Sequence, residues 1–150
     1  MTIYTDDYWM QRALELAQQG MATAEVPVGA IVVLDNKIVG QGYNCPIAKQ
    51  DPTAHAEIIA MRNAAQHLKN YRLINTTLYV TLEPCPMCAG AMLQARIKRL
   101  VYGTVDLKGG AVSSKLELFG HKWNHDIVCS SGILAEPCAN ILREFFQARR

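Results

Sequence analysis

The sequence contains no apolar run of the roughly 18 residues that a membrane-spanning helix needs. Its first residues carry neither the basic start nor the apolar stretch of a signal peptide. The five cysteines form an odd set, and two of them make a Cys-x-x-Cys, which disfavours a secreted disulfide framework. Charged residues make up 19% of the chain, with 15 basic against 13 acidic, which excludes a disordered or strongly acidic chain. The sequence therefore predicts a cytoplasmic protein with no membrane partner.

A chain of 150 residues, half of them apolar, is long enough to bury one core, and we expect a single domain over residues 1–150. Its charge is distributed unevenly. Residues 1–93 carry six Lys/Arg against eight Asp/Glu, whereas residues 94–150 carry nine against five. The basic excess of the C-terminal third indicates either an ordinary solvated face or a surface for a polyanionic partner.

Hydrophobic periodicity predicts alternating strands and helices along the chain. Apolar spacings of three and four predict helices at residues 6–20, 52–68, 86–95 and 134–147, the second of them capped by Asp51. Shorter apolar runs predict strands at residues 28–34, 37–43, 77–82, 99–103 and 126–129. The first two strands flank Asp35-Asn36, a two-residue turn, and form a hairpin. The pattern is weak from residue 104 to 125, apart from one helical turn around Leu116 and Phe119.

Strands that alternate with helices are typical of layered α/β domains. The order of the predicted elements therefore favours a three-layer α-β-α sandwich. The stretch from residue 104 to 125 is long for a connection inside such a domain, and connections of this length are usually functional or mobile.

Two short segments have the residue types of a catalytic metal site. His55-Ala56-Glu57 stands near the start of one predicted helix, and Pro84-Cys85-Pro86-Met87-Cys88 at the start of the next. Cysteines three apart at a helix start face the same side, where the helix dipole favours thiolates. One imidazole and two thiolates are three ligands for zinc, which leaves a fourth position open, as in catalytic sites. Only two helix N-termini meeting at one metal would bring His55, Glu57 and both cysteines together.

The other three cysteines have a simpler interpretation. Cys45, Cys129 and Cys138 are expected to be buried apolar thiols rather than ligands.

The pair of segments resembles the signature of the zinc-dependent nucleobase deaminases. Within that superfamily the chain resembles the bacterial tRNA-specific adenosine deaminases over nearly its whole length. The matching stretches are Glu25 to Ala30, Asp51 to Glu57, Asn70 to Leu73, Thr77 to Cys85, Gly132 to Ala135, and the Phe145-Phe146…Arg149-Arg150 ending. Two positions depart from the family pattern: Cys45 stands where arginine is common, and Val105 precedes Asp106 where a basic residue often does.

The resemblance implies a cytidine deaminase-like fold with a mixed five-stranded sheet, a homodimer, and hydrolytic conversion of adenosine to inosine at the tRNA wobble position. It places one zinc ion on His55, Cys85 and Cys88, where water activated by the metal attacks C6 of adenine, and it makes Glu57 the proton shuttle. It also implies that Asn44 contacts the base and that Asp106 meets the backbone of the anticodon loop. From the basic C-terminal third we expect Lys108, Arg149 and Arg150 to approach the RNA.

Two other functions are compatible with the same residues. A deaminase of free cytidine, deoxycytidylate or guanine would use the same zinc and glutamate, but it would not need the basic C-terminal third. A structural-zinc RNA-binding module would need the metal ligands but not Glu57.

Overall fold

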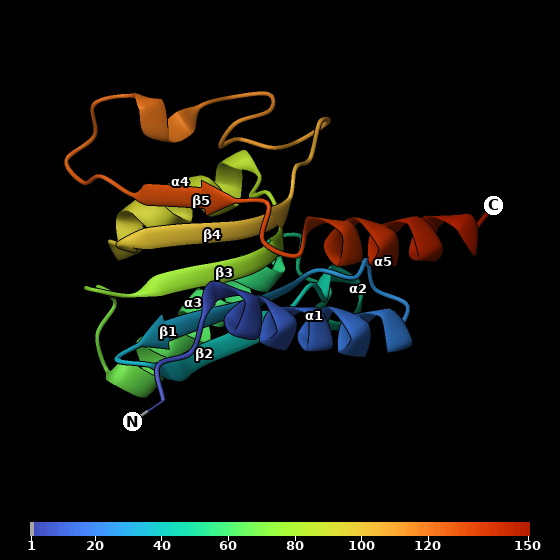
Figure 1. Ribbon diagram of the computed structural model, residues 1–150, viewed down its shortest axis with the longest axis horizontal. Helices are drawn as coiled ribbons and strands as arrows, with labels where there is room; N and C mark the ends of the chain where they lie inside the picture. Colours follow the sequence, from blue (N-terminus) through green and yellow to red (C-terminus); the bar gives the residue numbers. More distant parts are fainter. Residues whose placement is uncertain (1) are drawn as a thin grey trace.

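The computed structural model describes residues 2–150 and contains one five-stranded sheet with helices on both faces (Figure 1). The helices are α1 (Asp6–Ala22), α2 (Pro46–Lys49), α3 (Ala56–Leu68), α4 (Pro86–Ala95) and α5 (Ala135–Gln147), with a 3₁₀ turn η1 (Leu118–Gly120). The strands are β1 (Gly29–Leu34), β2 (Lys37–Tyr43), β3 (Thr77–Leu82), β4 (Arg99–Thr104) and β5 (Val128–Ser131). None of the helices in residues 2–150 is both long enough and apolar enough to span a bilayer.

The sheet is mixed and has the strand order β2-β1-β3-β4-β5. β1 pairs antiparallel with both β2 and β3, whereas β3, β4 and β5 run parallel to one another. Parallel neighbours need a crossover, and α4 supplies it between β3 and β4. The predicted mixed five-stranded sheet is confirmed.

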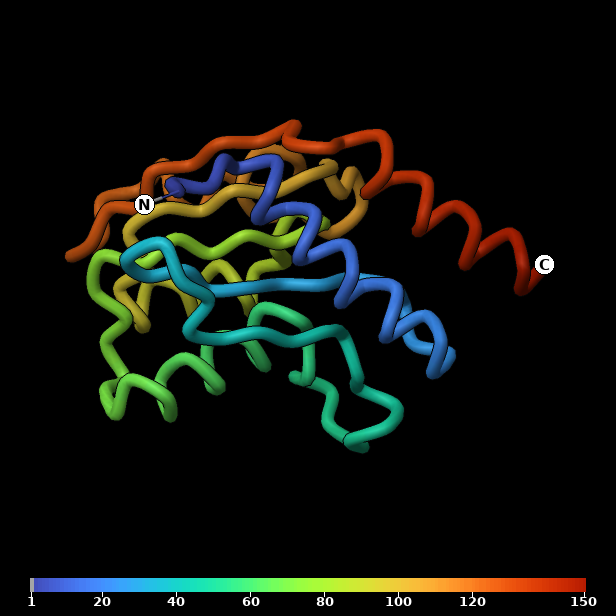
Figure 2. The backbone as a smooth tube through the Cα atoms, turned by 60° about the horizontal axis from the view of Figure 1, so that its bottom comes forward, coloured from blue at the N-terminus to red at the C-terminus, as the bar shows by residue number. Residues whose placement is uncertain are grey.

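The layers follow from alternation along the central strands, which are buried on both faces. Ile31, Tyr79 and Val101 point to one face, where they form a core with α1 and α5. Val32 and Val80 point to the opposite face, where they pack with α3 and α4. Figure 2 shows α1 and α5 on one side of the sheet and α3 on the other, so the predicted three-layer sandwich is confirmed.

The β1–β2 hairpin is also confirmed. Asp35 and Asn36 both adopt positive φ angles, of 50° and 60°, as a type I′ turn requires. Asn and Asp tolerate this region better than other residues with a Cβ, so the turn residues predict the geometry that the chain adopts.

The predicted start of the second long helix is wrong. We expected Asp51 to cap a helix with proline at its first position, but Asp51 instead accepts hydrogen bonds from the backbone N (2.9 Å) and Oγ1 (2.7 Å) of Thr53. This local turn competes with the helix and delays its start to Ala56, with His55 as N-cap. A proline does begin a helix shortly before this turn, at Pro46 in the short helix α2, which the sequence pattern did not predict.

In the C-terminal third, the structure confirms the predicted helix but differs from the prediction in the edge strand. Cys138 and Phe145 of α5 are buried against the sheet as expected. The last strand lies two residues later than predicted, at Val128–Ser131. It is the edge strand β5, and Cys129 on it is exposed, which corrects the expectation of a buried thiol. A strand with a neighbour on one side only has less to bury its side chains against.

Replacing Gly29 by alanine is expected to destabilise the protein by about 1–3 kcal/mol, the range of an overpacked core. A Cβ on Gly29 would lie 1.9 Å from the carbonyl oxygen of Ala13 and 2.7 Å from the backbone nitrogen of Ala17, so α1 would have to move off β1. Chemical denaturation measures the change. Gly120→Ala is the control, because its Cβ would meet only the Cβ of Glu117 at 3.7 Å. Equal stabilities of the two variants would contradict this account of the α1–β1 contact.

Candidate metal centre and active-site pocket

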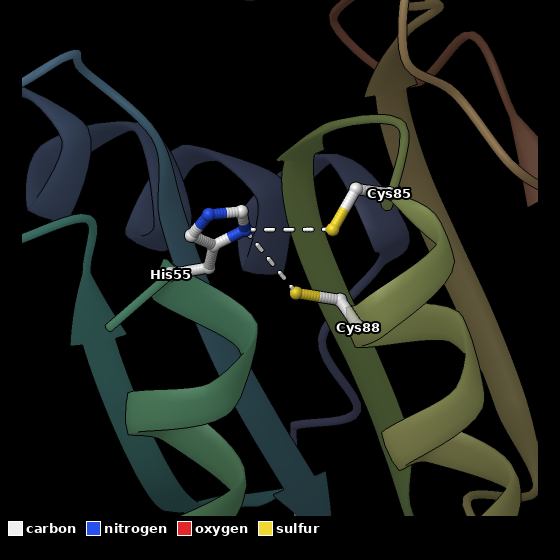
Figure 3. Close-up of side chains that lie close together, drawn as sticks. All are labelled: His55, Cys85 and Cys88. Atoms are coloured by element: carbon white, nitrogen blue, oxygen red, sulfur yellow. Dashed lines mark hydrogen bonds between the residues drawn. The ribbon is translucent and has the colours of Figure 1, made fainter. Parts of the chain in front are cut away.

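Two helix N-termini meet beyond the carboxyl end of β3. His55 is the N-cap of α3, Cys85 is the N-cap of α4, and Cys88 lies in the first turn of α4. Neither N-cap side chain makes a capping hydrogen bond, so both remain available to a ligand. Figure 3 shows the imidazole of His55 facing the two sulfur atoms across the gap between the helices.

The distances between these side chains suit a tetrahedral metal. Nδ1 of His55 lies 3.5 Å from Sγ of Cys85 and 3.5 Å from Sγ of Cys88, and all three donor atoms lie within 4.8 Å of one another. With Zn–S and Zn–N bonds of roughly 2.3 and 2.0 Å, a tetrahedral angle places nitrogen and sulfur about 3.5 Å apart. The three predicted ligands are therefore brought together in a geometry compatible with zinc.

The protonation preferences of this cluster are coupled. A hydrogen bond with Cys88, with a further contribution from His55, lowers the pKa of Cys85 to about 4. The hydrogen bond with Cys85 raises the pKa of His55 and, together with burial, that of Cys88. Cys85 is therefore the thiol that most readily becomes the thiolate, the form that binds a metal.

Glu57 lies beside this cluster in the first turn of α3 and is 4% exposed. Its carboxylate is not among the three converging donor atoms. Burial raises the pKa of Glu57 to about 7, because an ionised carboxylate is costly away from water. The start of α3 thus places a candidate metal ligand, His55, and a buried titratable carboxylate, Glu57, at one site, although residues two positions apart in a helix point in different directions.

A cavity of about 210 Å³ opens onto His55, Cys85 and Glu57. Its other walls are partly apolar and partly polar, and they consist of Val26, Val28, Asn44, Leu82, Glu83 and Asp106. Apolar walls with a few convergent polar groups are the usual composition of a small-molecule or base pocket. Asn44 and Asp106, predicted to contact the substrate, both line it.

Asn44 is held on one wall of the cavity. Its backbone N donates to the carbonyl oxygen of Val28 (3.0 Å), and its Nδ2 donates to that of Val26 (3.3 Å). The second bond fixes the orientation of the amide and leaves Oδ1 available to a ligand.

Glu83 also lines the cavity. Sequence patterns assigned no role to this residue. It is 2% exposed and accepts hydrogen bonds from the backbone N of Asp106, Val112, Ser113 and Ser114 and from Oγ of Ser114. The partners all belong to the connection after β4. The sequence does show an acidic residue directly after a buried strand, which could have signalled a role for Glu83. Its hydrogen-bond partners lie more than 20 residues further along the chain, so no local pattern connects them with it.

The basic residues expected to approach RNA lie outside the cavity wall. Lys108 is exposed in the loop next to Asp106, whose Oδ1 accepts from the backbone N of Lys108 (3.1 Å). Arg149 stacks its guanidinium 3.5 Å from the ring centre of Phe145 and donates to the carbonyl oxygen of that residue, and Arg150 is exposed beyond it. Figure 1 shows α5 running out past the sheet to the C-terminus.

The two positions that depart from the family pattern differ in how exposed they are. Cys45 is buried at the start of α2, so its thiol is removed from the surface that an arginine would present. Val105 is 47% exposed beside Asp106 and offers an apolar surface where a cation is common.

The fold and the His-Cys-Cys cluster define a deaminase. A family model described as MafB19-like deaminase matches residues 4–150. The guanine deaminase from Nitrosomonas europaea shares the fold, with a TM-score of 0.85 over 97% of this chain and 86% of the other, at 22% identity.

Relatives with higher sequence identity show to which group of deaminases the chain belongs. The chain is 55% identical to a tRNA-specific adenosine deaminase of Haemophilus influenzae, over 97% of this chain and 85% of the relative. It is 40% identical to one of Streptococcus pyogenes, over 95% and 84%. A structure from studies of A-to-I editing by tRNA:A34 deaminases at the wobble position of transfer RNA superposes with a TM-score of 0.88 at 43% identity, over 90% of this chain and 99% of the other. The chain belongs to the family of the tRNA-specific adenosine deaminases.

Proposed function

We propose that this protein hydrolyses adenosine to inosine at the wobble position of a tRNA anticodon. The observation that carries the proposal is the convergence of His55, Cys85 and Cys88 beside the buried Glu57, in a chain closely similar to tRNA-specific adenosine deaminases. The alternatives of a free-nucleoside deaminase and of a structural-zinc module are not favoured by these relatives. We further propose that residues 1–150 act as one deaminase domain on tRNA, in the cytoplasm of a bacterium.

Zinc is the metal that the donor set fits, held by His55, Cys85 and Cys88. When bound there, it supplies a Lewis acid that makes water nucleophilic at neutral pH. The water adds to C6 of adenine, and the bond between C6 and the amino nitrogen breaks, so adenosine and water give inosine and ammonia.

Glu57 carries the protons of this reaction. Its carboxylate accepts a proton from the attacking water and delivers it to the ring nitrogen beside C6. It then takes the second proton, from the new hydroxyl group on C6, and passes it to the departing amino group, which leaves as ammonia while C6 becomes a carbonyl. A carboxylate buried at the base of the cavity can do both because it is shielded from exchange with bulk water. Asn44 presents Oδ1 to the base, and the apolar walls formed by Val26, Val28 and Leu82 exclude solvent from it.

We also propose a homodimer that forms over the outer face of α3 and α4. An apolar groove of about 390 Å³ runs between these helices, and Tyr71 at its edge is 70% exposed. Within the small-residue segment from Ala89 to Met92 on α4, Ala89 and Met92 are buried in the protein's own core. Only Gly90 and Ala91 of that segment remain on the outer face.

We expect one zinc per chain, and we expect Cys85→Ala to lose metal and activity together. Glu57→Ala should keep the metal and lose turnover, because its carboxylate is not a ligand. Metal analysis and a deamination assay on the same preparations measure both. Cys129→Ala is the matched control, since this exposed thiol lies outside the cluster. Near-normal turnover by Glu57→Ala would overturn the proton-shuttle assignment.

Arg149→Ala/Arg150→Ala should weaken binding to an anticodon stem-loop and flatten its salt dependence by up to about one unit of slope per lost phosphate contact. Binding titrations at several salt concentrations measure the slope, and zinc content should not change. Arg143→Ala is the control, because Arg143 on the same helix already lies 3.6 Å from Glu136. An unchanged affinity and slope in the double variant would make these cations ordinary surface residues. A wild-type protein that deaminates free cytidine and ignores the stem-loop would overturn the proposed substrate.

Ala91→Arg should turn the dimer into a monomer, because a charge would be buried against the partner subunit. Light scattering at micromolar concentration should give twice the chain mass for the wild type and the single chain mass for the variant. Gln147→Arg, an exposed change on α5, should remain dimeric. A monomeric wild type contradicts the proposed assembly, and a dimeric Ala91→Arg contradicts the proposed face.

A further inference from the structure

We infer that Glu83 is a positioning residue that holds the loop of residues 105–114 against the metal-ligand segment and thereby sets the affinity for RNA. The inference rests on the proposed function, because it concerns the same substrate. It assigns Glu83 to binding rather than to chemistry, although its side chain lines the same cavity as Glu57.

Both oxygens of Glu83 are fully occupied by the protein. Oε1 accepts from the backbone N of Asp106 (3.0 Å) and from Oγ of Ser114 (2.5 Å). Oε2 accepts from the backbone N of Val112 (3.1 Å), Ser113 (2.8 Å) and Ser114 (3.0 Å). A carboxylate with five donors around it has no lone pair left for a substrate proton.

The loop is joined to the strand end at several other points. The backbone N of Glu83 donates to the carbonyl oxygen of Thr104 (2.9 Å), and that of Ala111 donates to the carbonyl oxygen of Pro84 (2.9 Å). A Cβ on Gly110 would lie 2.3 Å from the carboxyl carbon of Glu83, so the loop backbone packs directly on the carboxylate. The loop therefore packs on the short segment between β3 and Cys85 and is hydrogen-bonded to it.

The loop carries the side chains that face the RNA in the proposed function. Asp106 lines the cavity, and its Oδ1 accepts from the backbone N of Lys108 and of Gly109 (both 3.1 Å), which closes a tight turn. A displacement at Glu83 is therefore passed to Asp106 and Lys108. The side-chain hydrogen bonds of Glu83 all go to the loop and none to His55 or Glu57 at the start of α3. A change at Glu83 should therefore leave the proton transfers unaffected.

The test is Glu83→Gln, which keeps the shape of the side chain but turns one oxygen into an N–H donor facing other N–H donors. We expect Kd for an anticodon stem-loop to rise by about tenfold, the cost of one or two broken charge-assisted hydrogen bonds. Binding is measured by fluorescence anisotropy in the Glu57→Ala background, where no substrate is consumed. In the active background, kcat at saturating RNA and zinc content should change by less than about threefold.

A double-mutant cycle with Asp106→Ala separates positioning from general loss of structure. If Glu83 acts through the loop, Glu83→Gln should weaken binding far less once Asp106→Ala is present. Glu25→Gln is the matched control, because Glu25 is also buried and accepts from the backbone N of Ile47 (3.3 Å) and Ala48 (2.8 Å), away from this loop. Its effect should add to that of Asp106→Ala.

Gly110→Ala perturbs the same contact from the loop side and should reproduce the rise in Kd if Glu83→Gln does not fold. A lower kcat with unchanged Kd, a loss of zinc, or an additive cycle with Asp106→Ala would overturn the inference. A wild-type protein that binds and deaminates the stem-loop, with an unchanged Kd in Glu83→Gln and Gly110→Ala, overturns the inference alone. A wild type that does not bind the stem-loop overturns the proposed function instead.

Discussion

The meeting of two helix N-termini over the carboxyl end of β3 is the constraint on which the rest of this site depends. The helix α3 arrives there from the β1–β2 side of the sheet, and α4 leaves β3 at the same end, so His55 faces Cys85 and Cys88 across a gap of 3.5 Å. Both helix starts direct positive dipole ends at the cluster, which favours thiolate sulfur. The sheet order that puts β1 next to β3 is what makes this meeting possible.

Two buried carboxylates line one cavity and differ in their surroundings. Glu57 is buried beside the His-Cys-Cys cluster, and burial raises its pKa to about 7. Glu83 is surrounded by backbone N–H groups, which hold its pKa low and occupy its oxygens. In the proposed mechanism the same functional group therefore serves in one position for proton transfer and in the other for holding a loop, and the number of hydrogen-bond donors around each carboxylate decides which.

The long connection after β4 is ordered by this second carboxylate. Residues 105–127 contain one short 3₁₀ turn and no strand, yet the part nearest the cavity is fixed through Glu83, Pro84 and Asp106. A loop held in this way can present Asp106 and Lys108 in one arrangement without a helix or strand of its own. Preorganisation of that kind lowers the entropic cost of binding a flexible RNA loop.

The sequence by itself predicted most of the elements and the three residues that converge in the His-Cys-Cys cluster. Short apolar runs marked β1, β3 and β4, Asp35-Asn36 fixed the hairpin turn, and Pro86 marked the start of α4, because these signals are local and depend on backbone preference. The family resemblance assigned His55, Glu57, Cys85 and Cys88, since those residue types recur at fixed spacing. The start of α3, by contrast, depended on whether Asp51 would cap a helix or close a turn with Thr53, and local preference alone did not separate the two. Only the tertiary structure decided that Glu83 faces the loop and that Ala89 points inward, because each depends on contacts between residues far apart in the chain, which no local pattern encodes.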